Sequence, residues 1–188
     1  MFKHCVILAG GKSSRMGSDK TKLPFGEFET LVDFEVSKFD KIFQNIYISS
    51  KNHKFSDKFK TIEDKFENFS PMGALWQILS NFKDEYIFIV PADMPFISIQ
   101  TINLLYENLQ NSDIINPRDD EFAHSLCGFF HSKVASIAKE LYENNIHKIG
   151  FLRQKCNAKT LYFKNNNEFF NINTPQDYQK AKEFLLQI

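Results

Sequence analysis

The residues best suited to chemistry lie in two short segments, each of which follows an apolar run. The first, residues 8–20, reads LAGGKSSRMGSDK and places Gly10 and Gly11 ahead of the cations Arg15 and Lys20. Paired glycines let backbone N–H groups approach a phosphate closely. Arginine can bind phosphate oxygens in bidentate fashion, and lysine acts as a compact charge. This pattern predicts a site for a nucleoside triphosphate, whose negative charge must be offset during phosphoryl chemistry.

The fragment Gly11-Lys12-Ser13 matches only the end of a P-loop. That motif requires G-x-x-x-x-G-K-[ST], and its leading glycine would fall at Val6, inside the apolar run. The dinucleotide-binding pattern G-x-G-x-x-G fails too, because Lys12 or Ser13 stands where its second glycine belongs. We therefore interpret the segment as a phosphate-binding loop of another kind.

The second segment is VPADMP, residues 90–95, in which Asp93 lies between two prolines that stiffen the loop. Mg²⁺ is usually held by one or two carboxylates, while water and substrate phosphates complete its coordination. One aspartate near a triphosphate is therefore sufficient, and we expect Asp93 to bind the metal. The structural alternative is that Asp93 caps the next helix, but that helix is predicted to begin near Ser98, too far downstream.

Short apolar runs alternate with amphipathic stretches and predict the elements that position these segments. The runs predict strands at residues 5–10, 45–50, 60–64, 86–90, 113–117, 124–130 and 159–164. The amphipathic stretches predict helices at residues 30–43, 72–82, 98–110, 132–144 and 175–188. This alternation predicts a three-layer, Rossmann-like α/β fold with a mostly parallel mixed sheet. Sheets of this kind bind ligands at the carboxyl ends of their strands.

The first segment resembles the signature of the molybdenum cofactor guanylyltransferase family: LAGG, a short variable gap, RMG and then DK. Matching segments follow in family order: IEDKF, SPMGAL, VPADMPFI, HSLCGFF and FFNINTPQDY, starting at Ile62, Ser70, Val90, His124 and Phe169. Sugar and terpenoid nucleotidyltransferases share the glycine loop in a looser form, so the ordered set is the more specific signal. The resemblance extends over the whole chain, and the length predicts a single nucleotidyltransferase domain, residues 1–188.

The resemblance implies a nucleotide site built around Asp64 and Asp93. Asp93 matches the family's metal-binding aspartate, and Asp64 matches its guanine-contacting aspartate. A carboxylate accepts hydrogen bonds from both N1–H and the N2 amino group of guanine, which selects guanine over adenine. From the residues alone, Asp64 beside Glu63 and Lys65 would be interpreted as a solvated surface charge. The GTP-binding residues are then Leu8, Ala9, Gly10, Gly11, Lys20, Ser49, Asp64 and Asp93, with Ser49 standing where the family often has Asn.

The acceptor side is predicted from residues near the end of the chain. Asn171 and Asn173 are expected on a strand before the last helix, where alternate residues face the same way. The resemblance places them beside the second substrate or the metal, whereas an asparagine pair that anchors a turn is the structural alternative. Lys148 and Arg153 could meet the acceptor's phosphate, although basic stretches are more often only solvated.

The resemblance implies transfer of GMP from GTP to molybdenum-bound molybdopterin, with release of pyrophosphate. Mg²⁺, Arg15, Lys20 and Asp93 are the expected catalytic groups, and no protein nucleophile is needed. Transfer of another nucleotide, such as CMP, or transfer to a sugar phosphate is the nearest alternative. A GTP-binding protein without turnover is a more distant one, because it would have less need of Asp93.

The overall composition limits the partners that we expect. Lys plus Arg and Asp plus Glu number 23 each, so no basic excess indicates nucleic-acid binding. No apolar run approaches the roughly 20 residues that span a bilayer, and the N-terminus lacks the features of a signal peptide. We therefore expect a cytoplasmic protein without membrane contact. Cys5, Cys127 and Cys156 are scattered and predict buried free thiols. For this family, delivery of the product to a molybdoenzyme or its chaperone is the expected further partnership.

Overall fold

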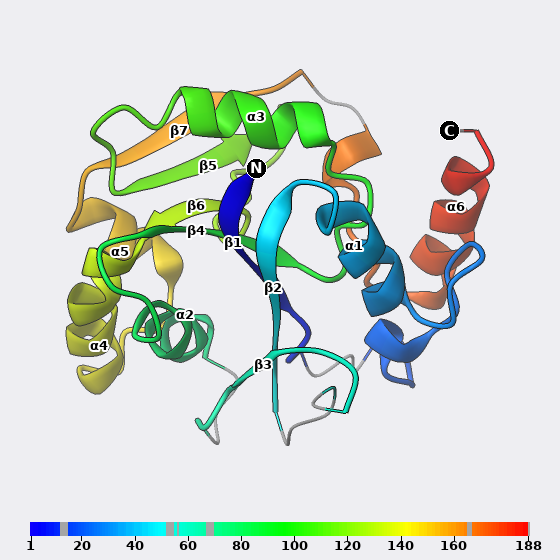
Figure 1. Cartoon of the computed structure of the whole chain (residues 1–188), viewed down its shortest axis with the longest axis horizontal. Coiled ribbons are helices and arrows are strands. Elements are labelled where there is room, and N and C mark those ends of the chain that lie inside the picture. Colours follow the sequence, from blue (N-terminus) through cyan, green and yellow to red (C-terminus); the bar gives the residue numbers. More distant parts are fainter. Residues whose placement is uncertain (12–14, 52–54, 56, 67–69, 165–166, 188) are drawn as a thin grey trace.

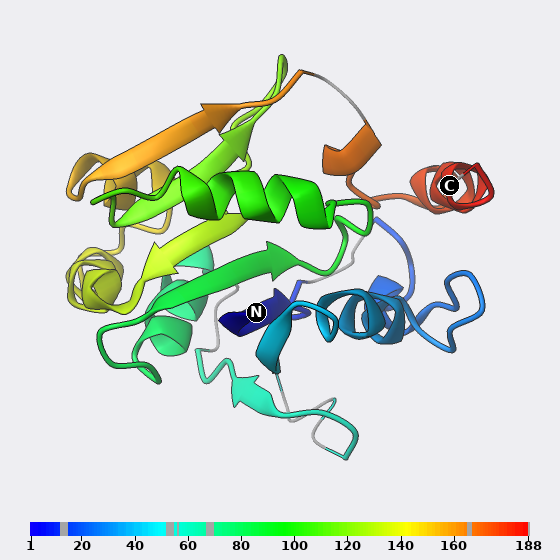
Figure 2. The same cartoon turned by 45° about the horizontal axis from the view of Figure 1, so that its top comes forward.

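The computed structural model describes residues 1–11, 15–51, 55, 57–66, 70–164 and 167–187. Its centre is a seven-stranded sheet in the order β3-β2-β1-β4-β6-β5-β7 (Figure 2). The strands are β1 (Phe2–Leu8), β2 (Phe43–Ser50), β3 (Thr61–Glu63), β4 (Tyr86–Pro91), β5 (Ile114–Arg118), β6 (Gly128–His131) and β7 (Ala158–Tyr162). Among these strands β6 alone runs antiparallel, against both β4 and β5. The predicted α/β class with a mostly parallel mixed sheet is therefore confirmed.

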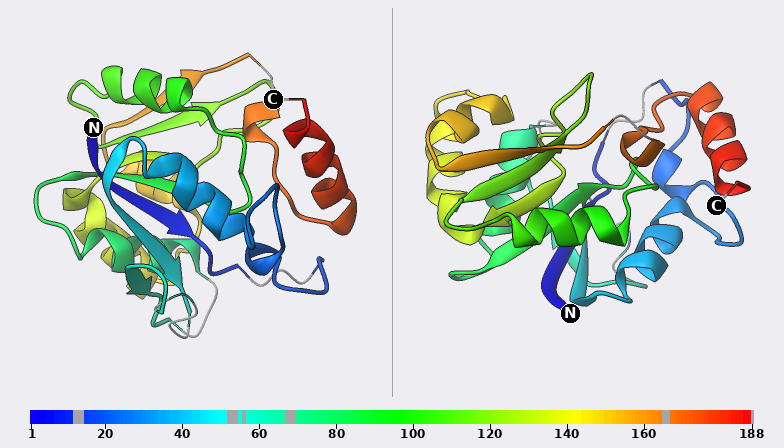
Figure 3. Two further views of the ribbon diagram at one scale, coloured as in Figure 1. Left: turned by 45° about the vertical axis from the view of Figure 1, so that its right-hand side comes forward. Right: turned by 90° about the horizontal axis from the view of Figure 1, so that it is seen from above.

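Helices cover both faces of the sheet and form the other two layers (Figure 1). They are α1 (Leu31–Phe39), α2 (Pro71–Leu79), α3 (Ile99–Glu107), α4 (Ala135–Glu143), α5 (Ile149–Gln154) and α6 (Pro175–Leu185), with 3₁₀ turns η1 (Lys20–Lys22), η2 (Ser132–Val134) and η3 (Asn167–Phe169). Helices α1 and α3 pack on one face, and α2, α4 and α5 pack on the other. Helix α6 stands at the side of the molecule, beyond α1 (Figure 3). None of the described helices has the length and apolar character needed to cross a membrane.

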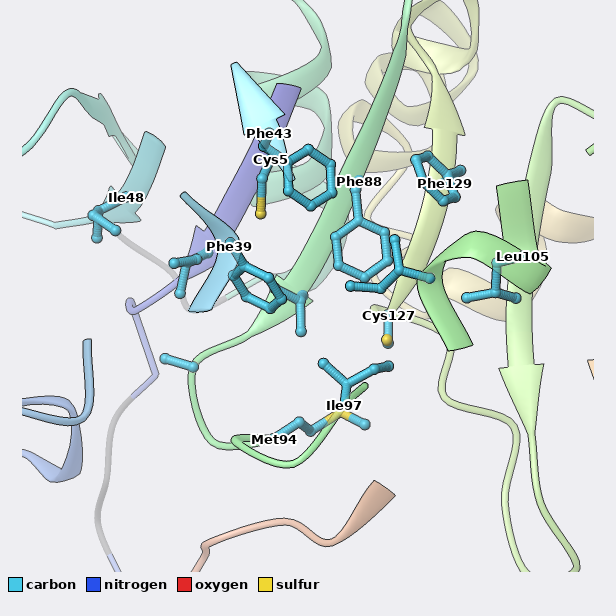
Figure 4. Packing of buried hydrophobic residues seen from close by; sticks show 14 of the residues in the cluster. Cys5, Phe39, Phe43, Ile48, Phe88, Met94, Ile97, Leu105, Cys127 and Phe129 are labelled. Carbon is cyan, nitrogen blue, oxygen red and sulfur yellow. The ribbon is translucent and has the colours of Figure 1, made fainter. Parts of the chain in front are cut away.

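The face under α1 and α3 is packed with aromatic rings (Figure 4). Phe43 and Phe88 stack with ring centroids 5.6 Å apart, and Phe39 and Phe129 meet Phe88 at an angle. Burial of each such side chain contributes about 1.5–3 kcal/mol. Much of the chain's high phenylalanine content therefore stabilises this core. The free thiols of Cys5 and Cys127 are also buried, as predicted, whereas Cys156 is only half-buried.

Side-chain caps fix where four of the helices begin. Thr30, Ser70, Ser98 and Thr174 each accept a hydrogen bond from the backbone N–H three residues later. Such a cap contributes about 1 kcal/mol. The predicted start of this helix near Ser98 is confirmed, and Ser98 caps it, which removes the alternative that Asp93 does so.

The predicted strand around Asn171 and Asn173 is wrong. The chain there forms η3 and then an irregular segment that leads into α6. The backbone of this segment bonds to the site rather than to a neighbouring strand. The N–H of Ile172 donates to the carbonyl of Asp93 at 2.9 Å, and the carbonyl of Ile172 accepts from Lys20.

Candidate active site

A cavity of about 400 Å³ opens at the carboxyl ends of β1, β2 and β4. The chain places β2 on one side of β1 and β4 on the other, so the strand order reverses there. In α/β sheets such a switch point leaves a crevice that binds ligands. The strand ends are tied together, because the N–H of Ala92 donates to the carbonyl of Leu8 at 3.0 Å and that of Ala9 donates to Ser49 at 2.8 Å.

The cavity brings together nearly all the residues that the sequence predicted. Its lining includes Leu8, Ala9, Gly10, Gly11, Arg15, Lys20, Ser49, Asp64, Asp93 and Asn173. Sequence analysis missed eight further lining residues: Thr21, Ser70, Pro71, Ala74, Leu75, Pro91, Ala92 and Leu126. Pro71 and Ala74 come from the start of α2, and the matched segment SPMGAL was the signal that could have identified them.

Lys20 and Arg15 form the cation-rich end of the cavity, and Lys20 contacts several other groups there. Its ammonium group forms an ion pair with Asp93 at 2.5 Å and donates to the carbonyl of Ile172 at 2.8 Å. The side-chain oxygen of Asn173 lies 3.4 Å from both Lys20 Nζ and a guanidinium nitrogen of Arg15. Lys20 therefore lies within hydrogen-bond reach of Asp93 and Asn173, and Arg15 lies within reach of Asn173.

The glycines of the loop leave open space at the cavity wall. A Cβ atom added at Gly10 would come no nearer than 4.0 Å to Asp64, Ser49 or Ser50. One added at Gly11 would meet no described atom within 4 Å. Neither glycine is required to avoid a clash within the protein, which fits close approach of a ligand to the backbone. Lys12, Ser13 and Ser14 lie outside the described residues.

Asp64 lines the same cavity and follows β3, which lies on the opposite side of β1 from β4 and Asp93. Its side chain is only 8% exposed, so the interpretation as a solvated surface charge is wrong. One carboxylate oxygen lies 3.3 Å from Lys51 Nζ, and the other accepts from the N–H of Phe66 at 3.1 Å. Lys51 also donates to the carbonyl of Phe66, which helps to fix both side chains. Sequence analysis did not identify Lys51; its place directly after β2 was the available signal.

A second cavity of about 520 Å³ adjoins the first and shares Pro71, Pro91 and Leu126 with it. Its lining includes Asn171 and Lys148. Asn173 lines the first cavity and Asn171 lines the adjoining second one, so a shared role for the two amides stays a prediction. Arg153 lines neither cavity, because its guanidinium bonds to Asn116 on β5 and Thr160 on β7.

Two histidines that sequence analysis did not assign line the second cavity. The ring of His124 stacks on Phe169 and bonds to Asp119 at 3.1 Å. Burial would raise the pKa of Asp119, but backbone N–H groups and His124 lower it overall. His147 bonds through Nδ1 to the hydroxyl of Ser70 at 2.7 Å, which links the second cavity to the first. Each ring is thus held by a specific partner.

The donors at the cation-rich end suit a hard cation that also binds substrate. Within the described ranges, no three His, Cys, Asp or Glu side chains gather into a metal site. Asp93 and Asn173 nevertheless offer oxygen atoms to the first cavity, and Mg²⁺ needs few protein ligands when phosphates and water supply the rest. The residues present therefore fit a metal that arrives with a nucleotide.

A switch-point cavity with a glycine loop, paired cations and a single loop carboxylate is the arrangement of a nucleotidyltransferase. The family model for the MobA-like NTP transferase domain matches residues 5–157, and the chain belongs to this family.

Curated relatives match almost the full length of the chain. A molybdenum cofactor guanylyltransferase from Campylobacter jejuni subsp. doylei is 44% identical over 97% of this chain and 96% of its own. Another, from Campylobacter jejuni subsp. jejuni serotype O:6, is 43% identical with the same coverage. The fold matches the crystal structure of molybdopterin-guanine dinucleotide biosynthesis protein A from Archaeoglobus fulgidus with a TM-score of 0.82, at 22% identity and 100% coverage of both chains.

Proposed function

We propose that this protein transfers GMP from GTP to the terminal phosphate of molybdenum-bound molybdopterin. The products are the guanine dinucleotide form of the molybdenum cofactor and pyrophosphate. The observation that carries the proposal is one cavity lined by Arg15, Lys20 and Asp93 and also by the carboxylate of Asp64, which follows β3 on the other side of β1 from β4 and Asp93. The names of the two Campylobacter jejuni relatives support the choice of nucleotide and acceptor.

GTP would lie along the cavity with its guanine at Asp64 and its phosphates over the backbone of residues 8–11. Asp64 would accept from N1–H and the N2 amino group of guanine. Arg15 and Lys20 would bind the phosphates and offset the charge that develops on pyrophosphate as it leaves. Asp93 would hold Mg²⁺, which supplies further neutralisation of the phosphate charge when bound.

The acceptor would occupy the second cavity, which opens beside the first. An oxygen of its terminal phosphate attacks the α-phosphorus of GTP in line. A new bond forms between that oxygen and the α-phosphorus. The bond from the α-phosphorus to the oxygen that bridges to the β-phosphate breaks, and pyrophosphate leaves. Positioning of the two substrates is the protein's main contribution, so no covalent intermediate is required. His124, Ser125, His147, Lys148 and Asn171 are polar residues that line this cavity and could meet the acceptor. A molybdoenzyme or its chaperone would receive the product.

Thermal denaturation with each of the four nucleoside triphosphates and Mg²⁺ tests the choice of nucleotide. Saturating GTP should raise the melting temperature by about 5–10 °C, since a ligand at 100 times its Kd adds about 2.7 kcal/mol. ATP, CTP and UTP should give much smaller shifts. A larger shift with CTP or ATP than with GTP would exclude guanylyl transfer, and equal shifts with and without Mg²⁺ would exclude the metal role of Asp93.

A further inference from the structure

Glu35 is a completely buried carboxyl group that the proposed reaction does not use. It lies on α1 and faces the aromatic core, with no exposed surface. Apart from the ammonium group of Lys38, no described residue offers a hydrogen-bond donor to its carboxylate oxygens. Its ion-pair partner is Lys38, one turn later on the same helix, whose Nζ lies 3.1 Å from Glu35 Oε2. A buried carboxylate with so few partners is costly, and a role for it must be sought nearby.

Lys38 connects this carboxylate to the loop that carries Asp93. Its ammonium donates to the carbonyl of Pro95 at 2.7 Å, across 57 residues of sequence. The same ammonium group lies over the ring of Phe39, 4.6 Å from its centroid. Glu35 forms an ion pair with the ammonium group of Lys38, and the same ammonium group bonds to the backbone of Pro95 at the end of the loop.

Other contacts fix the loop at its beginning and middle. The N–H of Ala92 bonds to Leu8, and the carbonyl of Asp93 accepts from Ile172. Met94, on the same loop, is buried in the core that also contains Phe39. Lys38 therefore supplies the restraint on the far side of Asp93, where the chain turns towards Ser98 and α3.

We propose that Glu35 and Lys38 form a positioning pair that fixes the loop of Asp93 for divalent-metal binding. The inference rests on the proposed function, because it takes Asp93 as the metal-binding carboxylate. Neither residue lines the cavity, so both act through the loop backbone rather than on the substrate.

The electrostatic surroundings of Glu35 agree with a functional pair. Burial chiefly raises the pKa of Glu35 to about 7; Lys38 opposes this shift and the negative charge of Asp93 adds to it. The negative charge of Asp93 is therefore one of the influences on the pKa of Glu35. The other titratable groups in this region are the buried thiols of Cys5 and Cys127, whose pKa values burial raises well above the usual range.

The test is a thermodynamic cycle on metal-assisted nucleotide binding. Calorimetry gives the Kd of GTP in EDTA and in Mg²⁺, and the ratio of the two isolates the metal's contribution from that of the phosphate-binding cations. In Lys38→Met this ratio should fall about tenfold, because a hydrogen bond from a charged donor is lost. Lys38→Arg should restore most of the wild-type ratio. Glu35→Gln, which is nearly isosteric, should also lower the ratio. Lys41→Met, at an exposed lysine just beyond α1, serves as the matched control.

Hydrogen exchange in the absence of nucleotide gives a second readout. Lys38→Met should speed the exchange of amides in residues 92–97 while exchange elsewhere stays at the wild-type rate. The proposal is overturned if the binding ratio is unchanged, or if exchange rises evenly across the chain, since that would show a purely structural role. If the wild-type ratio is itself near one, the metal role of Asp93 fails, which is a separate result from failure of the positioning pair.

Discussion

Lys20 holds together groups from three distant parts of the chain. It pairs with Asp93 from the loop after β4 and donates to Ile172 in the segment before α6. Its own position is set by η1, which Asp19 caps through a bond to the N–H of Thr21. A charge in this position can bind both the loop of Asp93 and the pyrophosphate that leaves. Removal of a contact of this kind commonly lowers the reaction rate about 10²- to 10³-fold.

At the same scale, Asp64 should decide which base is bound. Asp64→Asn keeps the shape of the side chain but presents one acceptor and one donor where guanine needs two acceptors. We expect the preference for GTP over ATP to fall by about tenfold or more. Competition binding of the two nucleotides measures it, with Asp57→Asn at an exposed carboxylate as the control. Unchanged discrimination would exclude a base-reading role for Asp64.

Glu35 should make stability depend on pH. Its folded pKa is about 7, above its usual 4.5, so the stability that it contributes is fully present below pH 4.5 and is lost as pH rises through 7. The loss is roughly 3 kcal/mol for a shift of this size. Urea denaturation between about pH 5 and about pH 8 measures this effect. As pH rises, the free energy of unfolding of Glu35→Gln should increase relative to that of the wild type. A constant difference between the two proteins would contradict this expectation.

At the scale of elements, the start of α6 positions a site residue. The carboxylate of Asp177 accepts from the N–H of Asn173 at 3.0 Å and from that of Thr174 at 2.8 Å, and Thr174 caps the helix in return. This capping box fixes Asn173 beside Arg15 and Lys20. The sequence predicted the helix, but the consequence of its cap for Asn173 needed the structure.

Loss of this capping box should affect both stability and substrate binding. Asp177→Ala should lower the free energy of unfolding by about 1 kcal/mol and raise KM for GTP, because Asn173 loses its anchor. Glu183→Gln, at an exposed position on the same helix, is the control. A loss of stability with unchanged KM would show that the cap does not position Asn173.

Apolar runs and amphipathic periodicity predicted most elements because these signals are local. The strand predicted around Asn171 was wrong because its backbone partners, Lys20 and Asp93, are far away in the sequence. Helix α5 was not predicted, since its six residues carry too little periodicity. The same limit explains why Lys51 was missed: its partner Asp64 is brought close only by the pairing of β2 with β3.

At the scale of the whole molecule, the strand order explains where the site lies. The chain places β2 on one side of β1 and β4 on the other, so the carboxyl end of β1 lies between those of β2 and β4. The glycine loop, Asp64 and Asp93 therefore meet at one edge of the sheet, as sequence analysis expected for this class. The position of antiparallel β6 between β4 and β5 could not be predicted, because strand pairing across such distances leaves no local signal.

The most direct test of the account is the reaction itself, run with purified protein, Mg²⁺, GTP labelled at the α-phosphate and molybdenum-bound molybdopterin. Label should appear in a guanine dinucleotide product, with one pyrophosphate released per product and no labelled protein intermediate. CTP should give little product in the same assay. Efficient transfer from CTP, or GTP cleavage that does not depend on the acceptor, would contradict the account.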